Sequence, residues 1–486
     1  MKNSGGSVAV SKAGTFNWRE PSQVATEADL ANVDVASRAP LGWRITGVCA
    51  FVALLETTAT GMVGGALSSI QETFNLSDTK AGFIPTVAIA GSLVVAVISA
   101  RLADNARRVS VLAGGAVLWS IAALASPWAP VFVLFLLSRA VLGATGQLNN
   151  PAAASLIADA HPASGRSKAY GFERMANYIG LPLGIGLGGA LSNSLGWRTA
   201  FTVMALPGLV AAFFALRTTE PPRGLGDLLD KVRRHQSDDI DEGPVRADAA
   251  RVMAAANQAP AVAPSQSIPA PSPSISERVG ALWAIRTYRS ILVGLPVLFF
   301  GLGALFFWST KYFEETHGMK EDAAGGISGG VGGTGIMIGI IIGSRYGDRS
   351  QGRAKGWRLA LAAMGLFGGA ASFALMVAVP GVAAQAVFYG LANVGIAIAI
   401  PNLTAAVADV IPAAMRGASF STLQFCLALG TAIGPPLVGA ASDLFGSLRP
   451  ALALLVLPLA VAAVIVRRGA STYDGDAALV IASAGG

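Results

Sequence analysis

The feature that most constrains this chain is a series of twelve apolar stretches, each long enough to cross a lipid bilayer. A membrane-spanning helix needs about 20 mainly apolar residues. Because no water in the hydrocarbon region can satisfy backbone polar groups, such a stretch crosses as an α-helix. The sequence therefore predicts an all-α integral membrane protein. The stretches cover residues 45–68, 81–100, 110–128, 131–158, 168–194, 199–216, 290–313, 322–344, 357–379, 382–408, 417–442 and 450–466.

The composition excludes the soluble classes of protein. Charged residues make up 13% of the 486 residues and hydrophobic residues 53%, whereas a soluble protein carries about 25% charged residues. The two cysteines, Cys49 and Cys426, both lie in apolar stretches, so no disulfide framework is expected. No metal or cofactor motif is present. The Gly-rich run 325–333 lacks the Gly-Lys-Ser/Thr ending of a phosphate loop, so we expect no ATP drive.

The stretches fall into two groups of six. Residues 45–217 form a predicted N-terminal six-helix bundle and residues 289–467 a C-terminal one. Between them, residues 218–288 are polar and rich in Pro and Ser, which predicts a disordered linker. Residues 1–44 and 468–486 form the terminal tails.

The basic residues indicate the orientation. With the N-terminus inside, 28 of the 35 Lys and Arg residues fall in inside segments and five in outside loops. This matches the positive-inside rule. We therefore expect a multi-pass protein of the cytoplasmic membrane with both termini cytoplasmic. The net charge of +7 then reflects this loop bias, and no nucleic-acid partner is expected.

Two short turns repeat between the halves. Residues 100–108 follow the second helix and residues 343–353 follow the eighth. Each turn has a small residue, then an aspartate (Asp104 or Asp348), then basic residues. Repeated halves of this kind are typical of transporters.

The first turn carries a family resemblance. It matches the pattern Gly-x-Leu-Ala-Asp-Arg-x-x-Arg-Arg of the major facilitator superfamily and departs from it at Ala100 and Asn105. The resemblance implies two pseudo-symmetric six-helix bundles and gating turns. It places Asp104 at the start of the eleventh helix, near residues 417–419. The matching positions are Leu102, Ala103, Asp104, Arg107 and Arg108.

Within the superfamily, several stretches are similar to the spinster branch, which implies a lysolipid or sphingolipid substrate. Two departures matter. That branch usually has Asp-Arg in the first helix, where this chain has Ala59-Thr60. It also has a Glu seven residues after the Arg of the fourth helix, where this chain has Gly146. The similar stretches are 118–120, 139–143, 157–159, 196–201, 220–224 and 434–443.

Charged residues inside the spans are functional candidates, because each costs about 2.5–3.5 kcal/mol at mid-bilayer. Glu56 lies in the first helix and Arg139 in the fourth, and both helices line the superfamily's central cavity. We hypothesise that the two face each other across the cavity and that Glu56 carries the coupled proton. The alternative is a static ion pair that fixes helix packing.

Three further charged residues allow two interpretations each. Glu173 and Arg174, in the fifth helix, form either a local gate or packing pair or part of a substrate site. Lys311, beside Trp308 and Tyr312, is either an interfacial anchor or an anion site at the cavity mouth.

Uncharged polar residues in the spans are weaker candidates. Each could contact substrate or simply bond between helices, which contributes about 0.6 kcal/mol on average. Tyr389 and Asn393 are preferred in the second half because the tenth helix should line the cavity. The candidates are Thr57, Thr58, Thr60, Gln147, Asn149, Asn150, Asn177, Tyr178, Tyr389, Asn393 and Gln424.

The resemblance and the intramembrane charges together favour a secondary transporter that works by alternating access. We expect proton-coupled export of an amphipathic or hydrophobic molecule such as a lysolipid, by a monomer surrounded by membrane lipids. A multidrug or metabolite antiporter and an importer of a small organic anion are the alternatives. A membrane receptor would need no repeated gating turns, and no catalytic constellation indicates an enzyme.

Overall fold

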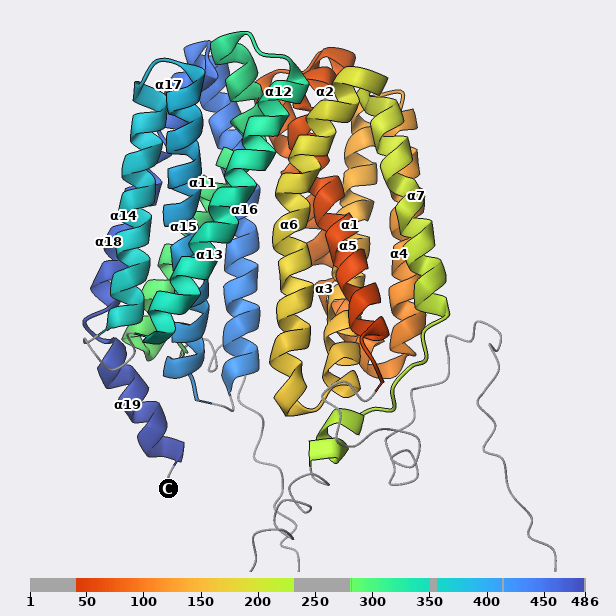
Figure 1. Ribbon diagram of the computed structural model, residues 1–486, viewed down its shortest axis with the longest axis vertical. Coiled ribbons are helices and arrows are strands. Elements are labelled where there is room, and N and C mark those ends of the chain that lie inside the picture. Colours follow the sequence, from red (N-terminus) through yellow and green to blue (C-terminus); the bar gives the residue numbers. More distant parts are fainter. Residues whose placement is uncertain (1–40, 231–279, 281, 350–355, 413–414, 485–486) are drawn as a thin grey trace, which may run out of the picture.

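The computed structural model describes residues 41–230, 280, 282–349, 356–412 and 415–484. The helices that it contains run roughly parallel and form two bundles side by side (Figure 1). One end of the two bundles, where residues 220–230 and α19 (Tyr473–Ala484) lie, is here called the linker end. The opposite end, which carries α2, α12 and α17, is called the far end.

The N-terminal bundle contains the first six long helices, which alternate in direction between the two ends. A short helix, α2 (Leu67–Phe74), lies at the far end between α1 and α3. The long helices are α1 (Arg44–Gly65), α3 (Asp78–Asn105), α4 (Arg108–Ala125), α5 (Phe132–Ala160), α6 (Ala163–Leu195) and α7 (Trp197–Leu216).

The C-terminal bundle repeats this arrangement with two interrupted helices. The π-helical segment η3 (Gly326–Val331) joins α12 (Glu321–Gly325) to α13 (Gly332–Arg349). Near the far end, α17 (Leu448–Ala453) continues into α18 (Val456–Gly469). The remaining long helices are α11 (Arg286–His317), α14 (Trp357–Ala378), α15 (Val382–Val410) and α16 (Arg416–Phe445).

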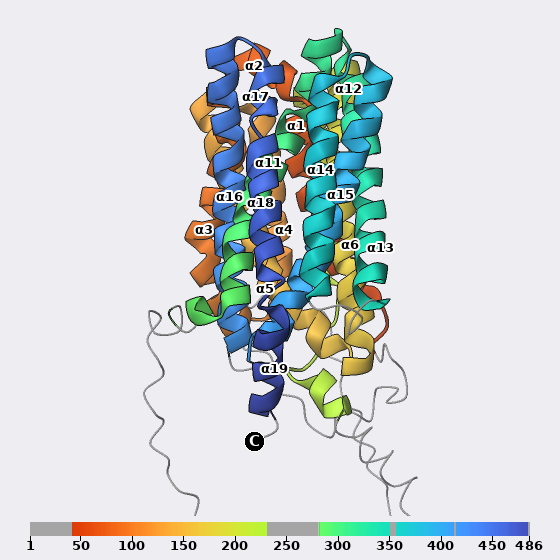
Figure 2. The same cartoon turned by 90° about the vertical axis from the view of Figure 1, so that its left-hand side faces the viewer.

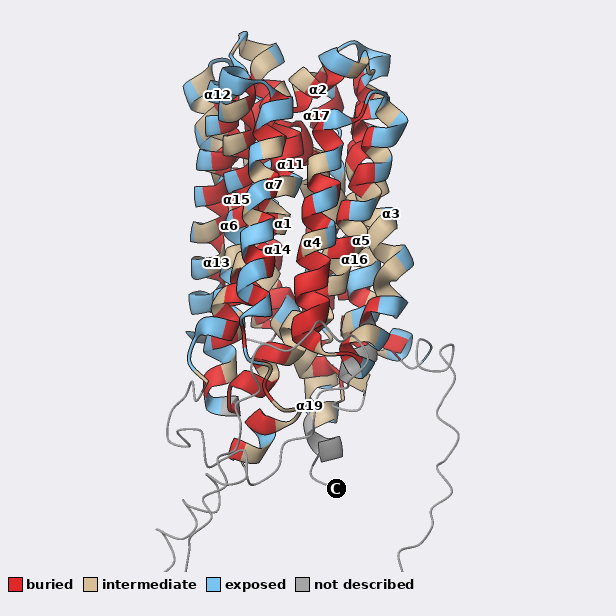
Figure 3. Cartoon of the chain, turned by 90° about the vertical axis from the view of Figure 1, so that its right-hand side faces the viewer, coloured by how far each residue is buried: buried red, intermediate tan, exposed pale blue. Residues whose placement is uncertain are grey.

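Eleven helical segments of the described chain are long and apolar enough to cross a membrane. The remaining long helix, α6, has 33 residues but falls short in composition, because polar and charged side chains such as Glu173 and Arg174 interrupt it. With α6, the long helices form the two groups of six that the sequence predicts. Their outer surface is largely exposed (Figure 3) and carries many large apolar side chains, such as Val94 and Leu457, as a surface facing lipid requires.

Glycines allow α1 and α6 to pack with their backbones in contact. A Cβ atom on Gly61 would lie 2.1 Å from the carbonyl oxygen of Leu181. One on Gly184 would lie 1.9 Å from the carbonyl oxygen of Thr58. Such close approach is typical of membrane helices, whose association depends on small residues at the contact. It fixes the position of α1, which carries Glu56.

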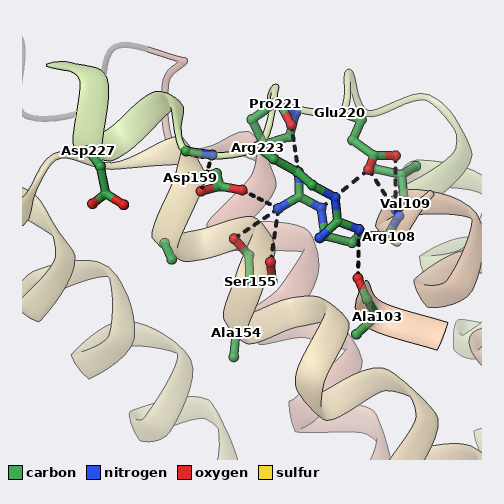
Figure 4. A network of polar contacts seen from close by, with 12 residues as sticks. Ala103, Arg108, Val109, Ala154, Ser155, Asp159, Glu220, Pro221, Arg223 and Asp227 are labelled. Carbon is green, nitrogen blue, oxygen red and sulfur yellow. Dashed lines mark hydrogen bonds and ion pairs between the residues drawn. The ribbon is translucent and has the colours of Figure 1, made fainter. Parts of the chain in front are cut away.

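A buried arginine holds three segments of the N-terminal bundle together at the linker end (Figure 4). Arg108, at the start of α4, is fully buried and forms an ion pair with Asp159 near the end of α5. Its Nε lies 3.3 Å from Oε1 of Glu220, and its Nη2 donates to the carbonyl of Pro221 at 2.6 Å. Arg107 lies 3.6 Å from the same glutamate. These partners all belong to the N-terminal half, so Arg108 clamps one bundle rather than joining the two.

The C-terminal half has a matching arrangement that the sequence analysis missed. Arg358, at the start of α14, lies 3.5 Å from Asp409 near the end of α15. Tyr473 also donates to Asp409, and burial together with this carboxylate raises the pKa of the tyrosine hydroxyl. Asp474 accepts from the backbone N–H of Gly356 at 2.8 Å, much as Glu220 accepts from that of Arg108 at 3.0 Å.

The predicted linker and C-terminal tail therefore need correction at their ends. After α7, residues 220–230 pack beneath the N-terminal bundle, with Leu225 and Leu229 buried. The chain after α18 forms a helix, α19 (Tyr473–Ala484), which lies beneath the C-terminal bundle (Figure 2). The Pro/Ser-rich part of the linker and the N-terminal tail lie outside the described residues.

Replacing Arg108 by Leu should strongly lower the stability of the protein. The substitution removes the paired cation of Asp159 and leaves Glu220 with only the partly exposed Arg107, and breaking a buried ion pair costs about 3–5 kcal/mol. Thermal unfolding of the purified protein in detergent should therefore show a clear fall in Tm. The control is Arg217→Leu, which removes an exposed arginine and should change Tm little. Equal Tm values for the two variants would contradict the clamp.

Candidate functional site

A cavity of about 540 Å³ lies between the two bundles. It is lined by α1 and α5 from the first half and by α11 and α15 from the second, the helices that the family resemblance places there, with contributions from α3, α4, α6, α13 and α16. Of the residues predicted for this site, the lining includes Glu56, Thr60, Arg139, Gln147, Asn150 and Asn393.

The two walls of the cavity differ in chemistry. The N-terminal half supplies both charged side chains and most of the polar ones. The C-terminal half supplies an almost wholly apolar surface in which Asn393 and Thr431 are the polar side chains. A molecule with a polar part and an apolar part would match both walls at once. The apolar wall consists chiefly of Phe299, Leu302, Phe306, Phe307, Ile336, Ile396, Ala397 and Ile400.

Glu56 lies in the second half of α1 and is partly buried in the cavity wall. Its Oε1 accepts a hydrogen bond from Nδ2 of Asn149 on α5. Its Oε2 would lie 3.3 Å from a Cβ atom on Gly146, one turn earlier on that helix. Its carboxylate is therefore held by an amide, with no cation among the ion pairs of the described residues.

Arg139 lines the same cavity but does not pair with Glu56. Its Nη2 donates to Ser126, and its guanidinium lies 5.0 Å from the ring centre of Phe135 and 5.3 Å from that of Phe201. Its Nε is buried without a hydrogen-bond partner among the described residues.

Both residues reach the cavity, as hypothesised, but no ion pair joins them among the described residues, so the alternative of a static ion pair is wrong. The reason is depth. Arg139 lies ten residues before Asn149, or about 15 Å away along α5, and aromatic rings near the far end hold it there.

The uncharged candidates separate into two groups. Thr60, Gln147 and Asn150 line the cavity, and Asn393 reaches it while donating to the carbonyl of Tyr389. Tyr389 itself is fully buried outside the cavity lining. Its hydroxyl donates to the carbonyl of Ser328, so it belongs to the packing of α15 against η3.

The predicted gating residues have different outcomes. Glu173 is buried and accepts from Asn177 at 2.7 Å, and Arg174 lies 3.4 Å from it with its side chain largely exposed. They form the local pair that the sequence indicated, and a gating role stays a prediction. The side chains of Asp104 and Asp348 lie outside the described part of the structure, so the latch predicted for Asp104 also stays a prediction.

The far end contains a junction between the halves that sequence reasoning missed. Asp443, near the end of α16, accepts from the backbone N–H groups of Asp78 and Thr79 at 3.0 and 2.9 Å. A carboxylate of one half thus caps the N-terminus of α3 in the other. Ser442 donates to Asp78 at 2.6 Å, and Lys311 forms an ion pair with it. Lys311 therefore joins the two halves, a contact that neither interpretation included, and both interpretations stay predictions.

A second pair of contacts continues this junction. Ser68 on α2 donates to Glu314 on α11. Ser69 donates to Glu321 through its backbone N–H at 3.1 Å and its hydroxyl at 2.7 Å. We call these contacts together with those of Asp443, Asp78, Lys311 and Ser442 the far-end junction. It bonds the two halves to each other at the far end. The sequence signals were present, as a Ser-Asp pair ending a long helix and an Asp beginning another, but the sequence does not show that they meet.

The described residues contain no group of three or more His, Cys, Asp or Glu side chains placed to hold a metal ion. The lining of the cavity offers charge, hydrogen-bonding groups and apolar contact.

Comparison with known proteins agrees with this geometry. A model of the Major Facilitator Superfamily matches residues 49–435. Human protein spinster homolog 1 is 33% identical over 184 residues, and Drosophila melanogaster protein spinster is 28% identical over 187 residues. The matched regions cover 37% of this chain and only 35% and 30% of those proteins, so the chain matches about a third of the length of these curated relatives.

Two solved structures share the fold. A bacterial homologue of the human lysosomal transporter Spinster, in an inward-facing and occupied conformation, superposes with a TM-score of 0.70 at 18% identity, covering 89% of this chain and 97% of that one. A D-xylose–proton symporter gives 0.64 at 17% identity, covering 87% and 97%. The spinster-like resemblance seen in short motifs is thereby confirmed. The chain belongs to the Major Facilitator Superfamily, and it is similar to spinster proteins over about a third of their length.

Proposed function

We propose that this transporter couples proton movement to the export of an amphipathic or hydrophobic organic molecule, such as a lysolipid, across the cytoplasmic membrane. The observation that carries the proposal is the two-sided cavity, polar on the N-terminal wall and apolar on the C-terminal wall. A head group would bind among Glu56, Gln147, Asn150 and Arg139. An acyl chain would lie against the phenylalanines of α11.

Glu56 is the group best suited to carry the proton. It is a carboxylate in the wall of the substrate cavity, within the membrane-spanning part of α1, where charge is costly unless it is paired or solvated. Substrate or water entering the cavity changes that solvation, and the change alters the affinity of the carboxylate for a proton.

Alternating access requires the two halves to rock about the cavity. With the positive-inside orientation, the linker end is cytoplasmic and the far-end junction closes the outer side. We propose that the described conformation faces inward. We further propose that the outward-facing state forms when the far-end junction breaks, with the halves then held by the linker-end turns that carry Asp104 and Asp348.

One observation favours a second candidate. Arg139 is a buried cation in the cavity wall whose Nε lacks a partner among the described residues, and a substrate anion would satisfy it. An importer of a small organic anion is therefore the alternative. Reconstituted vesicles assayed with a panel of lysophospholipids, apolar cations and dicarboxylates would distinguish the two, because an anion importer accepts only the last class.

Replacing Glu56 by Gln should abolish proton-driven transport while leaving substrate exchange. The amide keeps the shape of the side chain but binds no proton. We expect accumulation driven by a proton gradient in reconstituted vesicles to fall at least about tenfold, with exchange at equal pH retained. Asp322→Asn, which neutralises an exposed carboxylate at the far end, serves as the matched control. If Glu56→Gln retained full proton-driven transport, this result would contradict the proposed coupling role of Glu56.

Weakening the far-end junction should shift the transporter toward its outward-facing state. Replacing a helix cap by Ala costs about 0.5–2 kcal/mol, so Asp443→Ala combined with Lys311→Met should change the ratio of the two states by about tenfold or more. Spin labels at the exposed positions 195 and 454, one in each half, report the change as a longer distance in pulsed electron paramagnetic resonance. Ser194→Ala, which removes a hydroxyl bonded only within its own helix, should leave the distances unchanged. Identical distance distributions in the double variant and the wild type would refute the closing role of the junction.

A further inference from the structure

One buried amide, Asn149, is placed to act on Glu56. It is 2% exposed, and its Nδ2 donates to Oε1 of Glu56. Its Oδ1 is buried without a hydrogen-bond partner among the described residues. A buried oxygen without a partner is costly, and an apolar side chain of similar size would avoid that cost. The polar contact that accounts for an asparagine here is therefore the one with Glu56.

Two glycines give this contact its space. A Cβ atom on Gly115 of α4 would lie 2.0 Å from Oδ1 of Asn149, so any larger residue would displace the amide. A Cβ atom on Gly146 would lie 3.3 Å from Oε2 of Glu56. The amide and the carboxylate thus lie in a slot cut into α4 and α5, which we call the Asn149 slot.

The surroundings of Glu56 offer few other charges. Glu173 on α6 is a buried carboxylate of the same bundle, and it is bonded to Asn177 and paired with Arg174. Arg139 on α5 lines the same cavity about 15 Å further along the helix. Behind the glutamate, α4 and α7 present apolar side chains and a glycine. The α11 face of the cavity is also apolar, with Phe299 and Phe306. The amide is therefore the hydrogen-bond donor that supports the ionised carboxylate among the described residues.

We propose that Asn149 is the positioning residue of the proton site: it holds the Glu56 carboxylate at the cavity wall and stabilises its ionised form, in a slot that Gly115 and Gly146 keep open. This inference rests on the proposed role of Glu56. Asn149 lies on the cavity-lining helix α5, so movement of α5 relative to α1 changes the hydrogen bond and with it the readiness of Glu56 to take up a proton.

Another buried asparagine provides a matched control. Asn402 on α15 is 1% exposed, and its Oδ1 also lacks a partner and lies against a glycine, with a Cβ on Gly347 falling 2.2 Å away. Its Nδ2, however, donates to the backbone carbonyls of Gly343 and Ile398. The two amides have similar burial and packing, but only the Asn149 amide contacts a titratable group.

The test measures protonation of Glu56 directly, and this measurement needs no substrate. Infrared difference spectra of the purified full-length protein, recorded between alkaline and acidic buffer, show the carbonyl band of protonated carboxyl groups. The component lost in Glu56→Gln belongs to Glu56. In Asn149→Leu we expect the midpoint of that component to move to higher pH by about one unit, because a hydrogen bond to the charged form has been removed. In the acidic buffer, where Glu56 is protonated, thermal stability should fall little, since the substitution also removes the buried Oδ1 that lacks a partner among the described residues.

Further variants keep the proposal falsifiable. Gly115→Ala, which displaces the amide without removing it, should shift the midpoint in the same direction. Asn402→Leu should not shift the midpoint. Gly47→Ala should not shift it either, because a Cβ atom on Gly47 meets nothing within 4 Å. An unmoved midpoint in both Asn149→Leu and Gly115→Ala, or an equal shift in Asn402→Leu, would overturn the positioning role while leaving Glu56 as the coupling residue. If instead Glu56→Gln removes no band and transports normally with a proton gradient, the proposed function fails as well.

Discussion

The structure depends on the cost of placing charge where no water is present. In a hydrocarbon environment a charged side chain needs a protein partner or a wet cavity, and this chain meets that requirement in a different way at each level. At the linker end, Arg108 is paired with two carboxylates of its own half. At the far end, Lys311 and Asp443 find partners across the junction. Between these ends, Glu56 and Arg139 open onto the cavity instead of onto each other.

The two halves are alike at their linker ends and differ in their cavity walls, and both features bear on the proposed function. Both bundles have an Arg–Asp pair at the linker end, Arg108 with Asp159 and Arg358 with Asp409, so each bundle is internally fixed and can move as a unit. The cavity walls do not follow the symmetry. The N-terminal wall carries the charges, and the C-terminal wall is apolar. Rigid, similar bundles with dissimilar inner faces suit a carrier that must bind both parts of an amphipathic molecule and still rock as two bodies.

The fold could be predicted from sequence because hydrophobic length is a local property. The twelve spans and the two halves follow from runs of apolar residues, and Arg108 could be singled out from its motif. Contacts between distant segments could not be predicted. Nothing local shows that Asp443 caps α3 or that Asn149 meets Glu56. The prediction that Glu56 and Arg139 lie at one depth failed because depth was counted from opposite ends of helices of 22 and 29 residues. Glu56 contacts Asn149, which follows Arg139 by ten residues along α5, or about 15 Å.

The energies of the far-end junction bear on the proposed coupling between one proton and the rocking of the two halves. The far-end junction consists of a helix cap, an ion pair and serine–carboxylate hydrogen bonds. Caps contribute about 0.5–2 kcal/mol. The Lys311–Asp78 pair is largely buried, so the cost of removing its charges from water offsets much of their attraction. The far-end junction therefore stabilises the described conformation by only a few kcal/mol. The contacts that form in the proposed outward-facing state oppose this stabilisation. A shift of one pKa unit between two conformations is worth 1.36 kcal/mol. A single carboxylate that is solvated differently in the two proposed states can thus change their relative populations. This requires that its surroundings are well defined in each state. The Asn149 slot defines them for Glu56 in the described state.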